Sequence, residues 1–139
     1  MRMFQKEFYI SKKSRGFHLI TDEVLSNIEE IKVIKAGIAN IFLKHTSASL
    51  SLNENADSSV RDDFESFFND FADDKPYYTH TYEGSDDMPA HIKSSTLGAF
   101  LTIPITNGTF NLGTWQGIYL GEHRDMAERR KLIITIWGI

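Results

Sequence analysis

The feature that most constrains the fold is an alternation of apolar and polar side chains in the C-terminal third of the chain. One parity of residues 99–106 is apolar, comprising Ala99, Leu101, Ile103 and Ile105. This is the pattern of a strand with one buried face. Pro104 lacks a backbone N–H donor, so we expect this strand at a sheet edge or with a bulge. Asn107-Gly108 then predicts a two-residue hairpin, because both turn positions need positive φ.

Similar patterns predict the remaining elements. Further strands are expected at 4–10, 17–20, 38–45, 48–52, 110–112, 115–121 and 131–137. Helices are expected over 22–32 with Thr21 as the cap, over 60–71, and from Pro89 to Gly98. The second helix carries one apolar stripe of Val60, Phe64, Phe67, Phe68 and Phe71. The predicted strands outnumber the predicted helices and do not alternate with them as in repeated βαβ units. We therefore predict one α+β domain over 1–139, with a mostly antiparallel sheet curled into a sandwich or barrel.

Composition excludes several classes of site. The chain has no cysteine, which removes disulfides, zinc knuckles, iron–sulfur clusters and thiol nucleophiles. Any metal would need His, Asp or Glu ligands. The net charge is -4 and no basic stripe carries interleaved aromatics, so no nucleic-acid partner is expected. Residues 1–10 do not resemble a signal peptide, and no apolar run approaches the roughly 20 residues of a membrane span. We expect a cytoplasmic protein without membrane contact.

One basic cluster does occur near the C-terminus. It comprises His123, Arg124, Arg129, Arg130 and Lys131, and is interrupted by Asp125 and Glu128. Mixed charges of this kind are more typical of a solvated face than of a phosphate site. The first interpretation is therefore favoured over the second.

The first polar block follows a predicted core strand. His45 shares the parity of Ala39, Ile41 and Leu43, where a single histidine is usually buried and bonded to the backbone. Short polar residues then gather between 46 and 57, which makes a poor core but a good pocket rim. Asn55 or Asp57 could equally well cap the Phe-rich helix. Both interpretations stay open at this point.

The second polar block, residues 80–95, is predicted to be a loop leading into a helix. It contains two histidines, three acids, one lysine and several hydroxyls, and a helix N-terminus there would favour an anion. His45, His80 and His91 could converge as an open zinc-type site of three imidazoles. Alternatively, the imidazoles and Lys93 bind phosphate or act as acid and base. The simplest alternative is three unrelated surface histidines.

The third block, residues 113–117, places glycines on both sides of Trp115 and Gln116. Glycines within a strand-forming sequence indicate a bulge or a close backbone approach. Trp115 and Gln116 lie on opposite parities, so only one of them can face the core.

These three blocks resemble the signatures of the YjbQ family. The matching segments are residues 45–50 (HTSASL) with 53–57 (NENAD), residues 86–95 (DDMPAHIKSS), and residues 112–118 (LGTWQGI). Glu122-His123-Arg124 follows as in many members. Three long matches in the same order are far more specific than any short pattern. The resemblance covers essentially the whole chain.

The resemblance implies a sandwich-like α+β subunit that assembles as a homotrimer, with a pocket shared near a subunit boundary. Members are described as secondary thiamine-phosphate synthases, which join hydroxymethylpyrimidine diphosphate to thiazole phosphate and release diphosphate. Some carry zinc or an anion near the histidines, and magnesium would accompany the diphosphate substrate. The family activity is regarded as weak and incidental, so the fold alone does not identify the substrate.

The resemblance also implies roles for individual residues. His45, His80 and His91 match the family's histidine positions and are predicted to bind zinc, another divalent metal or phosphate. Three further positions are predicted to be catalytic, namely Asp57, Asp87 and Lys93. The predicted substrate-binding positions are Asn55, Ser94, Thr114 and Gln116. Some members carry another histidine where this chain has Pro89, so a site needing that ligand is not expected here.

Two other classes of function fit the same residues. A trimeric module could bind a phosphorylated metabolite or metal without turning it over, because it needs the same anion-friendly pocket. Turnover with release of diphosphate would favour the enzyme, whereas saturable binding without product would favour the module. A structural partner protein is a third interpretation. It predicts that substitutions in the pocket are silent while the exposed acidic helix face matters.

Overall fold

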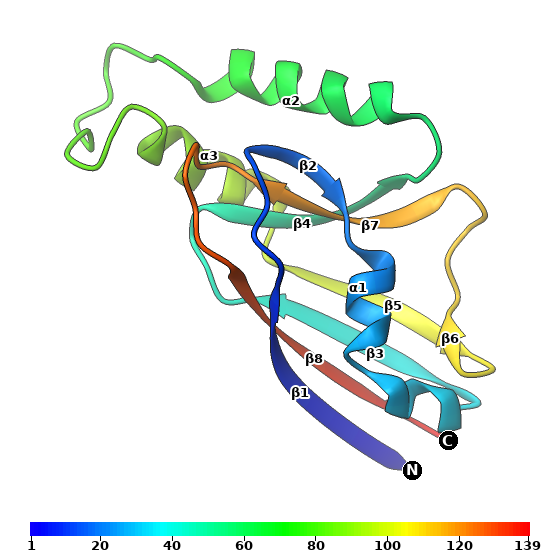
Figure 1. Cartoon of the computed structure of the whole chain (residues 1–139). Coiled ribbons are helices and arrows are strands. Elements are labelled where there is room, and N and C mark those ends of the chain that lie inside the picture. The colour runs from blue at the N-terminus through cyan, green and yellow to red at the C-terminus, as the bar shows by residue number, and fades with distance from the viewer.

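The computed structural model describes all residues, 1–139, as three α-helices, one short 3-10 helix and eight strands. In chain order these are β1 (Arg2–Ile10), β2 (Gly16–Leu19), α1 (Thr21–Ser26), η1 (Glu29–Val33), β3 (Ala36–Leu43), β4 (Ala48–Glu54), α2 (Ser58–Ala72), α3 (Asp87–Leu97), β5 (Phe100–Thr106), β6 (Thr109–Phe110), β7 (Gln116–Glu122) and β8 (Arg130–Gly138). The fold is α+β, as predicted, and every strand pairing is antiparallel (Figure 1).

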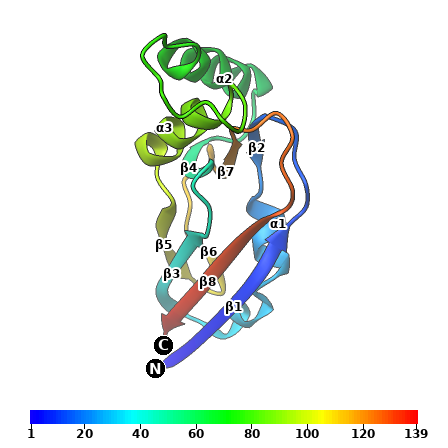
Figure 2. The same ribbon diagram turned by 90° about the vertical axis from the view of Figure 1, so that its left-hand side faces the viewer.

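Two sheets carry the fold. Five strands pair in the order β1-β8-β3-β5-β6, and three pair in the order β2-β7-β4. The predicted hairpin joins β5 to β6, with positive φ at both Asn107 and Gly108. A single apolar core of nineteen buried residues runs between the sheets and beneath α1 and η1. Figure 2 shows α2 and α3 at the end of the molecule that carries β2, β4 and β7.

The predicted helix over 22–32 is divided in the structure. It becomes α1 and η1, and the Thr21 side chain does not cap it. Instead the Thr21 hydroxyl accepts a hydrogen bond of 2.9 Å from the backbone N–H of Ile118 on β7. The cap prediction was therefore wrong, because a distant strand uses the hydroxyl that local sequence assigns to the helix.

The Phe-rich helix α2 is confirmed, but its stripe is only half buried. Phe64 packs edge-on against Phe17 of β2, with ring centroids 5.4 Å apart. Phe67 and Phe71 stack on each other at 6.4 Å and stay exposed. The helix therefore rests on β2 and β7 along one narrow line. No helix of the chain is long and apolar enough to cross a membrane.

Candidate functional site

Three of the residues singled out from the sequence meet at the N-terminus of α3. Asp87 and His91 lie one turn apart on this helix, and His80 reaches them from the preceding loop. The Nε2 atom of His80 is 2.7 Å from Oδ2 of Asp87, and the Nε2 atom of His91 is 3.4 Å from Oδ1. One ligand atom from each residue lies within 4.8 Å of the others, which is close enough for the three to share a metal ion. We call these residues the His80–Asp87–His91 cluster.

The backbone fixes the orientation of His91. Its Nδ1 lies 2.8 Å from the carbonyl oxygen of Thr46, in the loop between β3 and β4. A carbonyl can only accept, so Nδ1 carries a proton, and in the neutral ring the lone pair of Nε2 then faces the cluster. A carbonyl holding the outer nitrogen of a histidine is the arrangement found around metal-binding imidazoles.

Arg124 holds the acidic side of the cluster. Its guanidinium donates to Asp87 Oδ1 at 2.6 Å, to Asp86 Oδ2 at 2.9 Å and to the carbonyl of Glu83 at 3.0 Å. Burial alone would raise the pKa of Asp86, but hydrogen bonds from the Asp125 N–H and from Arg124 lower it below its usual value. Asp87 is almost completely buried, and its contact with Arg124 fixes the orientation of its side chain.

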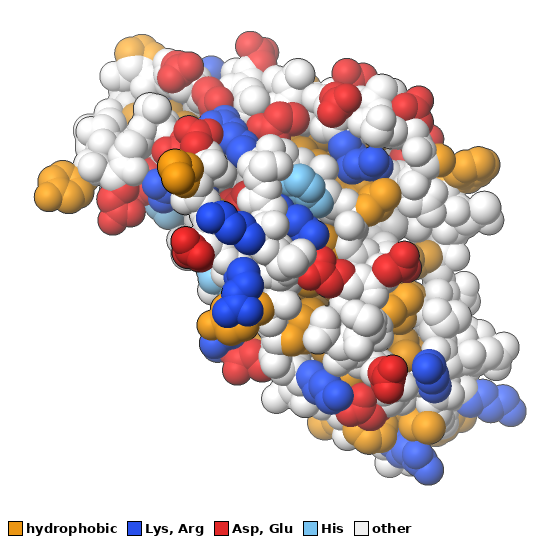
Figure 3. Space-filling view, viewed as in Figure 1, with side chains coloured by type: hydrophobic (Ala, Val, Ile, Leu, Met, Phe, Trp, Pro, Cys, Tyr) orange, Lys and Arg blue, Asp and Glu red, His pale blue; other side chains and the backbone are white.

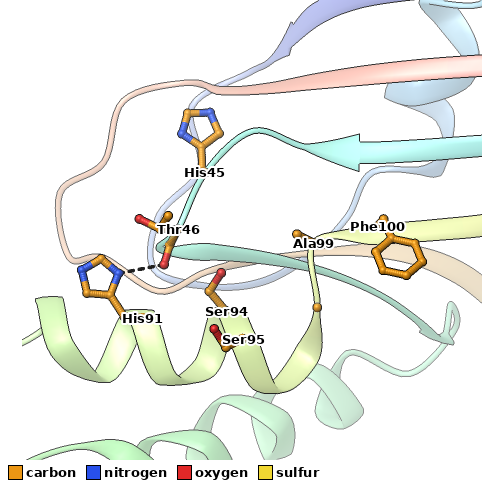
Figure 4. A pocket seen from close by; sticks show the side chains of 8 residues that line it. His45, Thr46, His91, Ser94, Ser95, Ala99 and Phe100 are labelled. Carbon is orange, nitrogen blue, oxygen red and sulfur yellow. Dashed lines mark hydrogen bonds between the residues drawn. The ribbon is translucent and has the colours of Figure 1, made fainter.

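A pocket of about 660 Å³ opens beside His91. Its lining residues are His45, Thr46, His91, Ser94, Ser95, Gly98, Ala99 and Phe100 (Figure 4). In Figure 4 the side chains of α3 form the floor, His45 and Thr46 form one wall, and Phe100 lies at the start of β5. No lysine or arginine is among the lining residues, so the pocket itself offers hydroxyls and imidazoles to a ligand.

His45 borders the pocket but stands apart from the cluster. Its Nε2 accepts a hydrogen bond of 2.7 Å from the backbone N–H of Lys131, which occupies the lone pair that a metal would need. Burial, followed by the nearby charge of Arg130, lowers the pKa of His45. The structure thus brings His80 and His91 together with Asp87 as their third member, where the sequence had suggested His45.

Two predicted catalytic residues have structural partners away from the pocket. Lys93 is completely buried, and its ammonium group donates to Asn69 at 2.8 Å and pairs with Asp73 at 2.9 Å, both residues of the α2 region. Asp57 caps α2 by accepting from the N–H of Ser59 at 2.9 Å. Neither side chain lines the pocket, whereas Ser94, next to Lys93 in sequence, does.

The remaining predicted binding residues lie at the opposite end of β4 and β7. The Asn55 amide donates to the carbonyls of Thr114 and Gln116, each at 3.1 Å. The Gln116 side chain accepts from the N–H of Gly113 at 2.8 Å. The length of β7 separates this end from Glu122 and α3, roughly 20 Å at about 3.3 Å per residue (Figure 1). Within one chain, the third block therefore does not join the pocket.

Sequence reasoning missed a buried polar layer behind the pocket. Glu122 accepts two hydrogen bonds from Arg130, at 2.7 and 2.6 Å, and both side chains are buried. His123 lies beside them, its Nε2 2.9 Å from the hydroxyl of Ser49. Burial, followed by the charge of Lys93, lowers the pKa of His123 to about 3. The sequence signals were the mixed charge of residues 122–131 and the family match at Glu122-His123-Arg124. The solvated-face interpretation was wrong for His123 and Arg130, which are buried.

Comparison with known proteins identifies the family. The family described as UPF0047 protein YjbQ-like matches residues 6–139. This chain belongs to the YjbQ family. A YjbQ protein of Escherichia coli O157:H7 is 50% identical over 135 residues, covering 97% of this chain and 98% of its own. A UPF0047 protein of Synechocystis is 38% identical, covering 99% of this chain and 93% of its own.

Solved structures of YjbQ-like proteins share the fold. One from Sulfolobus solfataricus, described as of unknown function, superposes with a TM-score of 0.86 at 27% identity, covering 99% of both chains. Another from Clostridium acetobutylicum, described as an uncharacterised conserved protein of the YjbQ/UPF0047 family, gives 0.82 at 35% identity. It covers 95% of this chain and 99% of its own. The family assignment therefore rests on sequence and fold together.

Proposed function

We propose that this YjbQ protein is a metal-dependent transferase acting on phosphorylated small molecules, and specifically that it joins hydroxymethylpyrimidine diphosphate to thiazole phosphate. One observation carries the proposal. The His80–Asp87–His91 cluster adjoins a pocket that lacks any lysine or arginine of its own. A diphosphate entering this pocket would need its charge neutralised, and the cluster offers the ligands for a cation that could do so.

The donor atoms fit a divalent metal ion such as zinc. Imidazole nitrogens and a carboxylate are common zinc ligands, and His91 has its outer nitrogen held by a backbone carbonyl. His80 would exchange its hydrogen bond with Asp87 for the metal, while Arg124 would keep the carboxylate in place. A metal bound there would supply Lewis-acid stabilisation of the leaving diphosphate.

The pocket residues would bind and orient the two substrates. The hydroxyls of Thr46, Ser94 and Ser95 are available to donate to phosphate oxygens, and Phe100 offers an apolar ring for a flat heterocycle. In the reaction, the thiazole nitrogen bonds to the pyrimidine methylene carbon while the carbon–oxygen bond to diphosphate breaks. Diphosphate leaves with the bonding electrons and no proton is transferred. The protein therefore needs no serine nucleophile and no general base, and its work is positioning.

The test is formation of thiamine phosphate from the two phosphorylated precursors with magnesium and zinc present. Protein made in a host without its own synthase would be compared with His91→Ala and with a matched control, His18→Ala. His18 lies on β2 and its ring contacts the carbonyl of Ser14 at 2.7 Å, outside the cluster and the pocket. We expect product from the wild type and from His18→Ala, and at least about a hundredfold less from His91→Ala.

Two outcomes would overturn the synthase. Equal rates for all three proteins would assign the turnover to a contaminant or to another place on the chain. No product from the wild type, with saturable binding of either precursor, would replace the transferase by a ligand-binding module.

We also propose that other copies of this chain cover the apolar part of the open face of the five-stranded sheet, in a homotrimer, and leave the end that carries Tyr9 and Lys131 exposed. Large apolar side chains are exposed on that face, namely Met3, Ile38, Phe42 and Phe100. Phe42 and Phe100 are directly paired across β3 and β5, which places two exposed aromatic rings side by side next to the pocket. Light scattering coupled to gel filtration should give three times the chain mass for the wild type. Phe42→Ser should shift it to smaller species, and a monomeric wild type would exclude the assembly.

A further inference from the structure

The basic cluster of residues 123–131 divides into an inner and an outer set. Arg124 and Arg130 turn inward to acidic partners, and His123 is buried. Arg129 is exposed and Lys131 half-buried, and neither forms an ion pair. No carboxylate is in direct contact with the outer pair, and Glu7, the acid whose charge acts on Lys131 at longer range, is itself paired with Lys44.

An aromatic ring holds the outer pair in place. The guanidinium carbon of Arg129 lies 4.2 Å from the ring centroid of Tyr9, and the ammonium of Lys131 lies 4.9 Å from it. Attraction to the ring quadrupole orients a cation without cancelling its charge. Lys44 adds a third cation, because its backbone N–H donates to the Lys131 carbonyl at 3.1 Å. The side chain of Lys44 pairs with Glu7, the one acid in contact with this group.

This group adjoins the pocket directly. The backbone N–H of Lys131 donates to the ring of His45, and His45 forms a pocket wall. In the space-filling view, lysine and arginine side chains lie beside histidines along the left-hand margin, below α3, with acidic side chains among them (Figure 3). The pocket thus has the His80–Asp87–His91 cluster on one side and, beyond His45 on the other, the backbone of Lys131, whose side chain forms no ion pair; no lysine or arginine lines the pocket itself.

We propose that Arg129 and Lys131, held by Tyr9, form an anion subsite that binds the phosphate monoester of a ligand whose body occupies the pocket. The proposal rests on the proposed function in one respect, since it takes the pocket ligand to be phosphorylated. The metal cluster suits a diphosphate leaving group, whereas two cations on an exposed ring suit a monoester that stays bound throughout the reaction. This subsite would bind the thiazole phosphate, and the two substrates would enter from opposite sides.

Inorganic phosphate is the probe for the first test. It would be titrated into full-length protein at constant ionic strength while backbone amide resonances are followed by NMR. We expect saturable shifts at Lys44, His45 and residues 129–131. Arg129→Met with Lys131→Met should weaken this binding by at least about tenfold. Lys35→Met, which removes an exposed cation beyond the far end of β3, should leave it unchanged.

The role of Tyr9 gives a second variant that keeps every charge. Tyr9→Leu should weaken phosphate binding by a smaller factor, about threefold. Tyr9→Phe should bind phosphate as tightly as the wild type, because only the ring is needed. Absence of saturable shifts in the wild type would overturn the subsite. Equal phosphate affinity in the double methionine variant would overturn it as well.

A third protein separates failure of the subsite from failure of the proposed function. His91→Ala removes the metal cluster but leaves Tyr9 and both cations untouched, so phosphate should shift the same amides with the same affinity. If the wild type makes thiamine phosphate, the double methionine variant should raise KM for the thiazole phosphate about tenfold and leave KM for the diphosphate unchanged. Equal rises in both KM values would mean that Arg129 and Lys131 attract anions in general, which would overturn a dedicated subsite.

Discussion

The two ends of the β4–β7 pair differ in the partners that their polar side chains bind. One end carries Ser49 and Glu122, and the other carries Glu54 and Gln116. At the first end, buried side chains bind one another, and an imidazole lone pair of the nearby cluster stays open. At the second end, the exposed side-chain amides of Asn55 and Gln116 form hydrogen bonds with the backbone, so these groups are already paired. The first end therefore borders the candidate site, whereas the polar side chains of the second end only hold the backbone together.

Glu122→Gln should have the largest effect on stability. Removing this charge leaves Arg130 buried without its carboxylate, which we expect to lower the free energy of unfolding by about 3–5 kcal/mol. Urea unfolding at neutral pH measures the change. Glu128→Gln, a matched substitution on an exposed and unpaired glutamate, should give no measurable change. A loss below about 1 kcal/mol for Glu122→Gln would mean that water reaches Arg130 and that the Glu122–Arg130 ion pair is not shielded from solvent.

His123 should make this end sensitive to acid. Its pKa in the folded protein is about 3, against an ordinary value of 6.5, so the unfolded chain binds a proton that the folded chain does not. Its contribution is complete above pH 6.5 and is lost as pH falls toward 3, by up to about 1.4 kcal/mol per unit. His123→Gln should flatten the decline, leaving a difference of about 2–3 kcal/mol in the pH dependence between pH 7 and 4.5. Identical slopes for the two proteins would show that His123 becomes protonated in place.

Asp87→Asn should weaken zinc binding by about a hundredfold. The substitution removes the charge that lies between His80 and His91. Competition with a fluorescent chelator measures the affinity. Asp86→Asn is the matched control, because it also contacts Arg124 but touches neither histidine. We expect no more than about a tenfold loss for it. Equal losses for the two variants would mean that Asp87 acts only by anchoring Arg124.

Asn55→Ala should have the smallest effect and should confine it to stability. Losing two hydrogen bonds at an exposed position lowers the free energy of unfolding by about 1 kcal/mol. Zinc affinity should stay unchanged, because the cluster lies at the other end of β7. A loss of transferase activity in a stably folded variant would contradict the contrast drawn between the two ends of the β4–β7 pair. It would mean that this end completes the pocket of a neighbouring subunit.

The fold was largely predictable because its signals are local. Alternation over residues 99–106, the Asn107-Gly108 turn and the Phe-rich helix all depend on neighbours in sequence, and each appears as expected. The helix predicted over 22–32 is divided into α1 and η1, and the prediction of its cap failed for the opposite reason. Its supposed cap, Thr21, binds an N–H 97 residues away on β7. No local pattern reveals such a contact.

The site was predictable in part for the same reason. Asp87 and His91 are four residues apart on a helix, which places them on one face and could have been read from the sequence. Lys93 is two residues beyond His91, about 200° around the helix, so the sequence could have shown that it faces away from His91, whereas its burial against α2 depends on contacts that only the folded chain reveals. The contacts of Arg124 with Asp87 and of His45 with Lys131 span 37 and 86 residues, and only the folded chain reveals them.

The carbonyl of Thr46 has a consequence for how the site can change by mutation. Because the backbone supplies this acceptor, replacing Thr46 by almost any residue leaves the proton on Nδ1 of His91 and the lone pair on Nε2. The backbone of the turn between β3 and β4 therefore sets the tautomer of His91, and no single side chain determines it. Drift at position 46 can therefore reshape the pocket wall while the chemistry of His91 stays the same.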